Sequence, residues 1–447
     1  MKGRIVFVLE CIVTKFGGSS LANDEQFRKV RSILELEPTR RYLIPSAPGK
    51  RFPSDEKVTD LLYACHDLAS AGNSIEPQFV KIRERFLSIA QLLHLKVDAE
   101  SALDEVSRGI SGGRSRDWCA SRGEYLCGLL MADYLGWKFV DPAQGIRFRD
   151  DGTLDDEKTQ ELLSALLADG QPAVVPGFYG ARADGEVVTF SRGGSDITGA
   201  LVARAVNADI YENWTDVSGF LMADPRIIEG PAEITSITYK ELRELSHMGA
   251  SVLHEDAMFP VHRAGIPTNI RNTNKPYHPG TLISKNAPNE VSVPTITGIA
   301  GHKGYSVIYV EKSMMNSEVG FGRKVLSVLE EYGVSFEHMP TGIDSMCVVV
   351  NSSSLAPHRE EILARLEKLV EDSGSVSVND NMAIIATVGR GMVHNCGTAA
   401  RLFSAMSRAR INVRMIDQGS SELSIIVGVN DSDFEATIRA IYREFVA

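Results

Sequence analysis

The sequence predicts an α/β domain with a mainly parallel sheet, followed by two small ferredoxin-like units. One observation behind this is the alternation of short apolar runs with helix-like segments over residues 1–285. Another is an internal repeat beyond a polar linker at 285–294, because the pattern at 325–329 returns at 402–406. A chain that repeats in this way forms one structural unit per copy.

The predicted strands of the first domain are short and apolar, which is typical of strands buried between two layers of helices. Parallel sheets with such α/β/α layers bind ligands beyond the carboxyl ends of their strands. The glycine-containing turns of this chain fall at those ends. The strands are expected at 5–13, 43–44, 138–140, 173–175 and 208–211, and the helices at 24–36, 58–70, 77–93, 122–135 and 156–168.

Each copy of the repeat reads strand, amphipathic helix, strand, glycine-containing turn, strand, helix. This order predicts two βαββαβ units, at 295–372 and 378–447. The units are either structural appendages or sensors of small molecules. We favour sensors, because units this small gain stability when their sheets pair edge to edge.

Composition excludes several classes of protein. The net charge of −11 argues against nucleic acid as a partner and favours a soluble, cytoplasmic enzyme with no membrane association. The apolar run at the N-terminus is too short to cross a bilayer. Six cysteines without a C-x-x-C pair indicate reduced thiols rather than disulfides or a zinc site, and we assign no side chain as a metal ligand.

The segment 14–20, Thr-Lys-Phe-Gly-Gly-Ser-Ser, follows the first strand and precedes a helix. Gly17 and Gly18 lack Cβ atoms, so their backbone N–H groups can approach an oxyanion closely. Lys15 adds a mobile positive charge, and Ser19 follows in the turn. The segment therefore predicts a phosphate-binding turn, although its lysine precedes the glycines, unlike that of a P-loop.

Other polar groups fall at loop positions of the same domain. Arg192 is suited to hold a carboxylate through two hydrogen bonds, and Glu124 is suited to pair with an ammonium group. Asp196 can organise Lys15 or a Mg²⁺ ion. An arginine for a carboxylate and a glutamate for an amine together describe an amino-acid substrate, and the phosphate turn predicts phosphoryl transfer to it.

These segments resemble the signatures of the aspartate kinase (aspartokinase) family. The resemblance covers essentially the whole chain, in the same order, and the C-terminal repeats resemble the tandem ACT domains of that family. The segments that carry it are Lys-Phe-Gly-Gly-Ser-Ser at 15–20, Ser-Arg-Gly-Glu at 121–124, Arg-Gly-Gly-Ser-Asp at 192–196, Trp-Thr-Asp-Val-Ser-Gly at 214–219, Ala-Asp-Pro-Arg at 223–226 and Met-Gly-Ala-x-Val-Leu-His at 248–254.

The resemblance implies an amino-acid kinase fold at 1–285 and transfer of phosphate from ATP, with Mg²⁺, to L-aspartate. The product is 4-phospho-L-aspartate, the first step toward lysine, threonine and methionine. No dehydrogenase-length segment follows, so the chain resembles the monofunctional branch. The implied catalytic residues are Lys15 and Asp196; the substrate residues Ser46, Thr59, Glu124, Arg192 and Ser195; and the ATP residues Lys15, Gly17, Gly18, Ser19, Thr215, Asp216 and Arg226.

The family also implies that neighbouring ACT units bind an amino acid and pair chains into a homodimer or larger oligomer. The implied effector residues are Met315, Phe321, Phe336 and Glu337. Lysine is the first choice of inhibitor, because Glu337 can meet a cationic group, and threonine is the second. A simpler interpretation of Met315 and Phe336 is that both belong to the hydrophobic core.

Two features depart from the family pattern. Ser251 stands where the family commonly has a lysine near ATP, and the polar insert 50–57 lengthens the spacing between Ser46 and Thr59. Two other functions therefore stay open. One is a different enzyme of the same fold, such as a glutamate 5-kinase or a nucleotide or carbamate kinase. The other is an amino-acid sensor whose kinase domain is weak or inactive.

Overall fold

The structure is a computed structural model that describes residues 10–191, 193–249, 259–285 and 294–446. The chain forms two compact units, and two segments upstream of the predicted linker pack with the second unit rather than the first. The first unit comprises Met1–Phe220, Thr235–Tyr239 and Val252–Pro288, and the second comprises Leu221–Ile234, Lys240–Ser251 and Asn289–Ala447.

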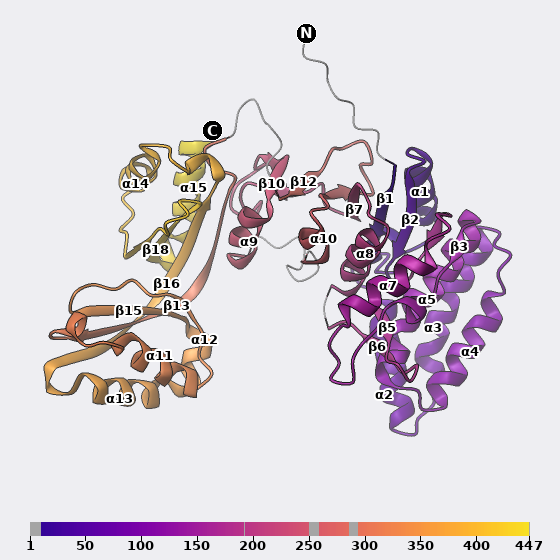
Figure 1. Cartoon of the computed structure of the whole chain (residues 1–447), viewed down its shortest axis with the longest axis horizontal. Helices are drawn as coiled ribbons and strands as arrows, with labels where there is room; N and C mark the ends of the chain where they lie inside the picture. Colours follow the sequence, from indigo (N-terminus) through magenta and orange to yellow (C-terminus); the bar gives the residue numbers. More distant parts are fainter. Residues whose placement is uncertain (1–9, 192, 250–258, 286–293, 447) are drawn as a thin grey trace, which may run out of the picture. The chain divides into compact units, whose positions relative to one another are not determined.

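The first unit is built on an eight-stranded sheet in the order β10-β12-β11-β7-β1-β2-β4-β3 (Figure 1). Every neighbouring pair is parallel except β11 and β12, which confirms the predicted, mainly parallel sheet. The strands are β1 (Ile12–Phe16), β2 (Arg40–Pro45), β3 (Lys138–Phe139), β4 (Ala173–Val174), β7 (Ile210–Thr215), β10 (Ser236–Thr238), β11 (Thr268–Asn272) and β12 (Thr281–Ser284).

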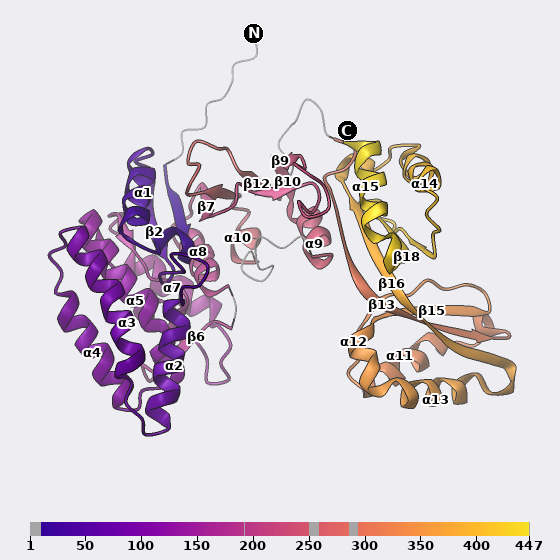
Figure 2. The ribbon, with the colours of Figure 1, turned by 180° about the vertical axis from the view of Figure 1, so that it is seen from behind.

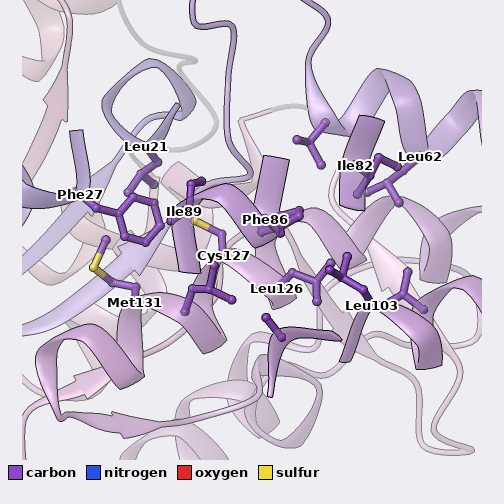
Figure 3. Packing of buried hydrophobic residues seen from close by; sticks show 14 of the residues in the cluster. Leu21, Phe27, Leu62, Ile82, Phe86, Ile89, Leu103, Leu126, Cys127 and Met131 are labelled. Carbon is purple, nitrogen blue, oxygen red and sulfur yellow. The ribbon is translucent and has the colours of Figure 1, made fainter. Parts of the chain in front are cut away.

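The side chains of β1 and β7 point alternately into the two layers on either side of the sheet, because successive residues of a strand face opposite sides. Phe16 and Trp214 stack on each other and join a hydrophobic cluster with five helices, which Figure 3 shows from close by. These helices lie beside one another in Figure 2: α1 (Asp24–Glu35), α2 (Val58–Ser70), α3 (Glu76–Leu92), α4 (Ala99–Ser111) and α5 (Arg116–Leu135).

Lys15 and Asn213 point away from that cluster, toward α8 (Gly194–Ala205). Helix α8 packs on β1, β2 and β7, and α7 (Asp156–Leu166) and α10 (Phe259–Ala264) pack on α8. Short elements complete the unit: η1 (Gly18–Leu21), α6 (Pro142–Gly145), and a hairpin of β5 (Tyr179–Ala181) and β6 (Val187–Thr189).

The second unit contains one antiparallel six-stranded sheet in the order β14-β15-β13-β16-β18-β17. Its strands are β13 (Gly298–Lys312), β14 (Phe336–His338), β15 (Ser345–Asn351), β16 (Gly374–Val388), β17 (Met415–Asp417) and β18 (Ser424–Asn430). Its helices are α9 (Tyr239–His247, from Lys240 onward), α11 (Phe321–Glu331), α12 (Ser352–Leu355), α13 (Arg359–Val370), α14 (Thr398–Arg408) and α15 (Phe434–Phe445).

The two repeats share the long strands β13 and β16, each of 15 residues. Residues 305–311 of β13 pair with β15 in the first repeat, whereas 298–302 pair with 384–388 beside the second repeat. The strand that closes the second repeat therefore comes from the start of the first predicted unit. Two separate hydrophobic clusters lie under this sheet, one for each repeat.

All six cysteines are free thiols, and Cys65, Cys119 and Cys127 are buried. Among the residues that the structure describes, no helix combines the length and the apolar character needed to cross a membrane.

Candidate functional site

A cavity of about 240 Å³ opens beyond the carboxyl ends of β1 and β2 in the first unit. Six residues predicted from the sequence line it together: Lys15, Ser46, Thr59, Glu124, Ser195 and Asp196. Each comes from a different part of the chain, since Lys15 lies in β1, Ser46 follows β2, Thr59 lies in α2 and Glu124 in α5, and Ser195 and Asp196 begin α8. Phe178, Gly193 and Gly194 complete the lining.

Lys15 and Asp196 form an ion pair at one wall of the cavity, with 2.6 Å between Nζ and Oδ1. The lysine is only 8% exposed, so this pair is little screened by water. Asn213, for which the sequence motifs predict no role, donates its side-chain amide to the same Oδ1 at 2.7 Å. The parallel register that sets Lys15 beside Asn213 was the missing signal, because no local motif contains both residues.

Glu124 lines the same cavity, and its carboxyl-bearing side chain belongs to a residue that is only 5% exposed. Desolvation by burial raises the pKa of Glu124 to about 8, although the backbone N–H of Ala47 and the charges of Lys15 and Arg122 favour its ionised form. Its Oε2 atom has no hydrogen-bond partner among the described residues. A buried carboxylate oxygen without a donor is costly, so it is ready to accept hydrogen bonds from a cation in the cavity.

The phosphate turn is packed against the loop that carries Ser46. A Cβ atom on Gly18 would lie 2.8 Å from the carbonyl oxygen of Ala47, and Gly49 N donates to Gly18 O at 2.8 Å. The turn enters the short helix η1, and α1 begins only at Asp24, where the Asn23 side chain caps it. Gly18 is therefore required for close contact between two loops, in addition to its predicted role toward phosphate.

Backbone conformation is unusual at the rim of the cavity. Gly193 takes the left-handed conformation (φ 59°) at the N-cap of α8, and Phe178 takes it at φ 81° without being a glycine. For a residue other than glycine, such a conformation costs roughly 1–3 kcal/mol and persists where the surroundings impose it. Here Phe178 N donates to Thr198 Oγ1 at 3.1 Å, and a Cβ on Gly194 would lie 2.6 Å from the Phe178 ring.

Most of the residues predicted to contact ATP lie at the ends of two neighbouring strands of the first unit, and one of them lies in the second unit. Gly17, Gly18 and Ser19 follow β1, and Thr215 and Asp216 lie at the end of the neighbouring strand β7. Gly17 N donates to Trp214 O at 3.0 Å, so the ends of these two strands meet. Arg226 belongs to the second unit, where it pairs with Asp224 at 2.6 Å. Arg192 and Ser251 lie outside the described residues.

The predicted effector residues are divided between the core and an edge strand. Met315 and Phe321 are buried in the hydrophobic cluster of the first repeat. Phe336 and Glu337 lie on the edge strand β14, where Phe336 is 45% exposed. The carboxylate of Glu337 lies 2.9 Å from Nε2 of His247, at the end of α9.

Helix α9 contacts both repeats through side chains three residues apart, which lie on one face of a helix. Glu241 accepts hydrogen bonds from Thr297 Oγ1 at 2.5 Å and Arg390 N at 2.9 Å. Glu244 accepts one from Ser424 in the second repeat, and His247 meets Glu337 in the first. The spacing of these three polar residues is visible in the sequence, but it does not by itself predict their partners.

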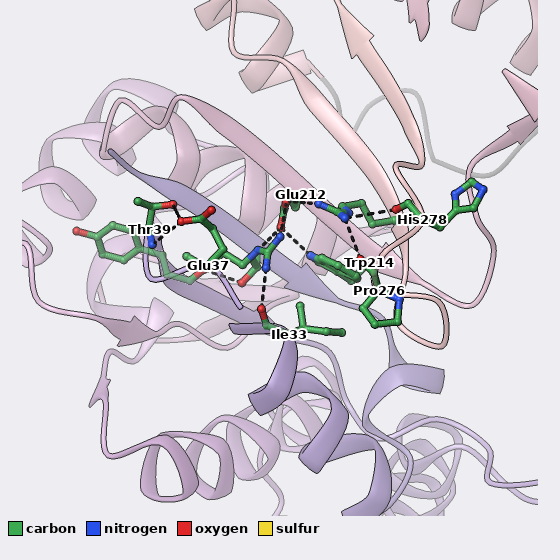
Figure 4. Close-up of polar contacts among 11 residues, drawn as sticks. Ile33, Glu37, Thr39, Glu212, Trp214, Pro276 and His278 are labelled. Carbon is green, nitrogen blue, oxygen red and sulfur yellow. Dashed lines mark hydrogen bonds and ion pairs between the residues drawn. The ribbon is translucent and has the colours of Figure 1, made fainter. Parts of the chain in front are cut away.

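Behind the cavity, a buried network braces the strand that carries Asn213 (Figure 4). Glu212 accepts two hydrogen bonds from Arg40, at 2.7 and 3.1 Å, and others from Arg271 at 3.0 Å and Trp214 Nε1 at 2.9 Å. Both guanidinium groups also lie over the Trp214 ring. The network joins β2, β7 and β11 and so holds the central strands in register.

Comparison with known proteins agrees with this arrangement of two units. Residues 10–272 match the model of the amino acid kinase family, and residues 385–445 match an ACT domain. The crystal structure of Clostridium acetobutylicum aspartate kinase, which is described as an allosteric enzyme, superposes with a TM-score of 0.91 at 50% sequence identity. That comparison covers 97% of this chain and 100% of the other.

Two curated relatives match over nearly their full length. Aspartokinase 3 of Bacillus subtilis (strain 168) is 39% identical, over 97% of this chain and 98% of the relative. The lysine-sensitive aspartokinase 3 of Escherichia coli (strain K12) is 24% identical, over 97% of this chain and 98% of the relative.

Proposed function

The chain belongs to the aspartokinase family and is an aspartate kinase, and we propose that it phosphorylates L-aspartate in the cavity between Lys15 and Glu124. One observation carries this proposal: a lysine–aspartate pair and a buried carboxylate with a free oxygen line the same cavity. The first suits phosphoryl oxygens and the second suits an ammonium group.

In the proposed reaction, an oxygen of the substrate's side-chain carboxylate attacks the γ-phosphorus of ATP. A new P–O bond forms as the bond to ADP breaks, which gives ADP and 4-phospho-L-aspartate. The attacking carboxylate is already ionised near neutral pH, so no general base has to remove a proton. The protein's tasks are therefore to align the reactants and to stabilise charge on the transferring group.

Lys15 is proposed to follow the charge on the phosphoryl oxygens, with Asp196 holding its ammonium group in place. Glu124 takes the substrate ammonium on Oε2, and Ser46, Thr59 and Ser195 line the substrate's side of the cavity. Arg192 is proposed to hold the α-carboxylate. Gly17, Gly18, Ser19, Thr215, Asp216 and Arg226 are proposed to contact the nucleotide.

The donor set fits Mg²⁺ only as part of a complex with ATP. Among the described residues, no cluster of three or more acidic, histidine or cysteine side chains is arranged to hold a metal. Mg²⁺ commonly binds through one or two carboxylates plus substrate phosphates, and Asp196 is the acidic group beside Lys15. Asp196 would hold the ion together with ATP, and the ion would supply positive charge that stabilises the transferring phosphate.

We further propose that the product leads toward lysine, threonine and methionine, and that lysine, threonine or both inhibit the enzyme through the second unit. An allosteric 50%-identical relative and a lysine-sensitive relative support an amino-acid effector. Glu337 is the proposed partner of its ammonium group. Met315, Phe321 and Phe336 form the rest of the proposed region.

Pairing of chains through the second unit is also proposed. Large apolar side chains are exposed at both edges of its sheet, with Phe336 on β14 and Ile416 on β17, and Val319 and Ile343 are exposed in the first repeat. Exposed apolar groups and open sheet edges commonly mark protein interfaces. Light scattering of the purified protein gives its mass in solution. We place the enzyme in the cytoplasm, where its reactants ATP and aspartate are available.

A substrate panel and a site variant test the proposal together. ADP formation is measured with L-aspartate, D-aspartate, L-glutamate and L-asparagine. We expect turnover with L-aspartate alone, and Glu124→Gln should raise the KM for aspartate at least 10-fold with a smaller effect on the KM for ATP. Preference for L-glutamate would favour the alternative kinase. If the KM for ATP rises instead, Glu124 does not bind the ammonium group.

A further inference from the structure

We propose that Asn213 is a positioning residue for phosphoryl transfer: its side-chain amide holds the carboxylate of Asp196, which in turn sets the position of Lys15. The proposal rests on the roles proposed above for Lys15 and Asp196. It names a residue outside the glycine-rich motifs, on strand β7.

Two donors share a single oxygen of Asp196. Lys15 Nζ lies 2.6 Å from Oδ1, and Asn213 Nδ2 lies 2.7 Å from the same atom. Among the described residues, no donor meets Oδ2, and the Asp196 side chain is 16% exposed at the cavity. One oxygen is thus held by protein, and the other remains available to the reactants.

The strand register and the position of α8 bring Asn213 and Lys15 into contact with Asp196. Lys15 and Asn213 are paired neighbours on the parallel strands β1 and β7, so both side chains point from the same face of the sheet toward α8. Asp196 lies in the first turn of α8, directly over them. Asn213 is 2% exposed, and a buried amide left without an acceptor would be costly.

A neutral donor suits this position better than a charged or an apolar group. Because Asn213 also donates a hydrogen bond to Oδ1, the interaction of Lys15 with that oxygen is weaker than it would be if Lys15 were its only donor. Lys15 can then follow charge that moves onto the phosphoryl oxygens. A leucine here would leave Lys15 as the sole protein donor, and an aspartate would place a second carboxylate beside Asp196.

The same strand offers a matched control. Tyr211 lies two residues before Asn213, on the same face, and its hydroxyl donates to the backbone oxygen of Asp196 at 3.3 Å. Tyr211→Phe therefore removes a hydrogen bond to the same residue without touching its carboxylate. A role in folding alone predicts similar effects at both positions, whereas positioning of the carboxylate predicts an effect only at Asn213.

The test compares kcat, KM and thermal unfolding for Asn213→Leu, Asn213→Asp and Tyr211→Phe. We expect Asn213→Leu to lower kcat about 10- to 100-fold, the range that loss of a hydrogen bond to a charged group implies. Both KM values should stay within about 2-fold. Asn213→Asp should lose more, and Tyr211→Phe should keep near-native kcat. Asn213→Ser, which retains a shorter donor, replaces the leucine variant if that variant does not fold.

A double-mutant cycle separates positioning from scaffolding. In an Asp196→Asn background, Asn213→Leu should change kcat by less than about 3-fold, because the two residues act as one unit. Additive losses, equal losses in Tyr211→Phe, or a native kcat in Asn213→Leu would overturn the inference. If Asp196→Asn and Lys15→Met themselves keep native kcat, the proposed function fails instead, so the two failures are distinguishable.

Discussion

His247 and Glu337 are joined across 90 positions of sequence by a contact of 2.9 Å between Nε2 and Oε2. His247 ends α9, and Glu337 lies in the middle of the edge strand β14. Burial, and after it the negative charge of Glu337, raises the pKa of the neighbouring Tyr305. Because the imidazole of His247 already contacts Glu337, an ammonium group that binds this carboxylate must share it with the imidazole or displace the imidazole.

This competition gives opposite predictions for the two partners. Glu337→Ala should weaken inhibition by lysine, and His247→Ala should strengthen it by about 2- to 5-fold, the effect expected for loss of one partly exposed polar contact. The measurement is the lysine concentration for half-inhibition, with threonine tested in parallel. His394→Ala is a matched control, since His394 pairs with Glu422 elsewhere in the second unit. Changes in the same direction for both variants would contradict the competition.

Replacing the lysine of the phosphate turn should abolish most of the activity while the fold persists. Lys15→Met removes the charge that pairs with Asp196, and the loss of such a group commonly lowers the rate about 10²- to 10³-fold. Initial rates of ADP formation give the result, and circular dichroism checks the fold. Lys158→Met, at an exposed pair with Glu161, should leave the rate unchanged. Native turnover in folded Lys15→Met would remove Lys15 from the mechanism.

Binding of aspartate should depend on pH through Glu124. Its pKa in the free site is about 8, so the carboxyl group is mostly protonated at pH 7 and must lose its proton to accept an ammonium group. The value of kcat/KM for aspartate should therefore rise up to tenfold per pH unit below pH 8 and level off above it. Glu124→Gln should flatten this rise. An unchanged pH profile in that variant would assign the ionisation to another group.

The same raised pKa has a consequence for stability without substrate. Glu124 binds its proton more tightly in the folded state than in the unfolded state, where its pKa is near the ordinary value of 4.5. Its contribution is therefore fully present below about pH 4.5 and is lost as pH rises toward 8. Glu124→Gln should reduce the decline of unfolding free energy across this window, measured by urea titration at several pH values. A decline of unchanged size would argue against a buried, protonated Glu124.

The network around Glu212 should matter for stability. Glu212→Ala would leave the buried guanidinium of Arg40 without its carboxylate, and that of Arg271 with one acceptor fewer, a change that typically costs about 3–5 kcal/mol. The midpoint of urea unfolding measures the loss. Glu35→Ala, at the exposed pair with Arg31, should cost less than about 0.5 kcal/mol. Equal effects of both variants would mean that the network adds little.

The sequence predicted those parts of the site that local patterns encode. Lys15 and Asp196 lie in glycine-rich segments next to a strand or helix end, and Glu124 lies in a recognisable motif. Asn213 was missed because its role depends on which strand pairs with β1 and in which register. The parallel sheet followed from the alternation of elements, whereas the strand at 298–302 joins residues 384–388 through pairing that no local pattern reveals.

The packing of α9 also determines which segments have to be exchanged together in a hybrid of two related enzymes. Glu241 is fully buried, and its partners Thr297 and Arg390 lie after the linker. In a hybrid of two aspartokinases joined at the linker 285–294, Glu241 would come from one parent, and the residues at positions 297 and 390 that contact it would come from the other. A transplant of the second unit should therefore carry residues 221–234 and 240–249 along with everything after the linker, because 235–239 belong to the first unit.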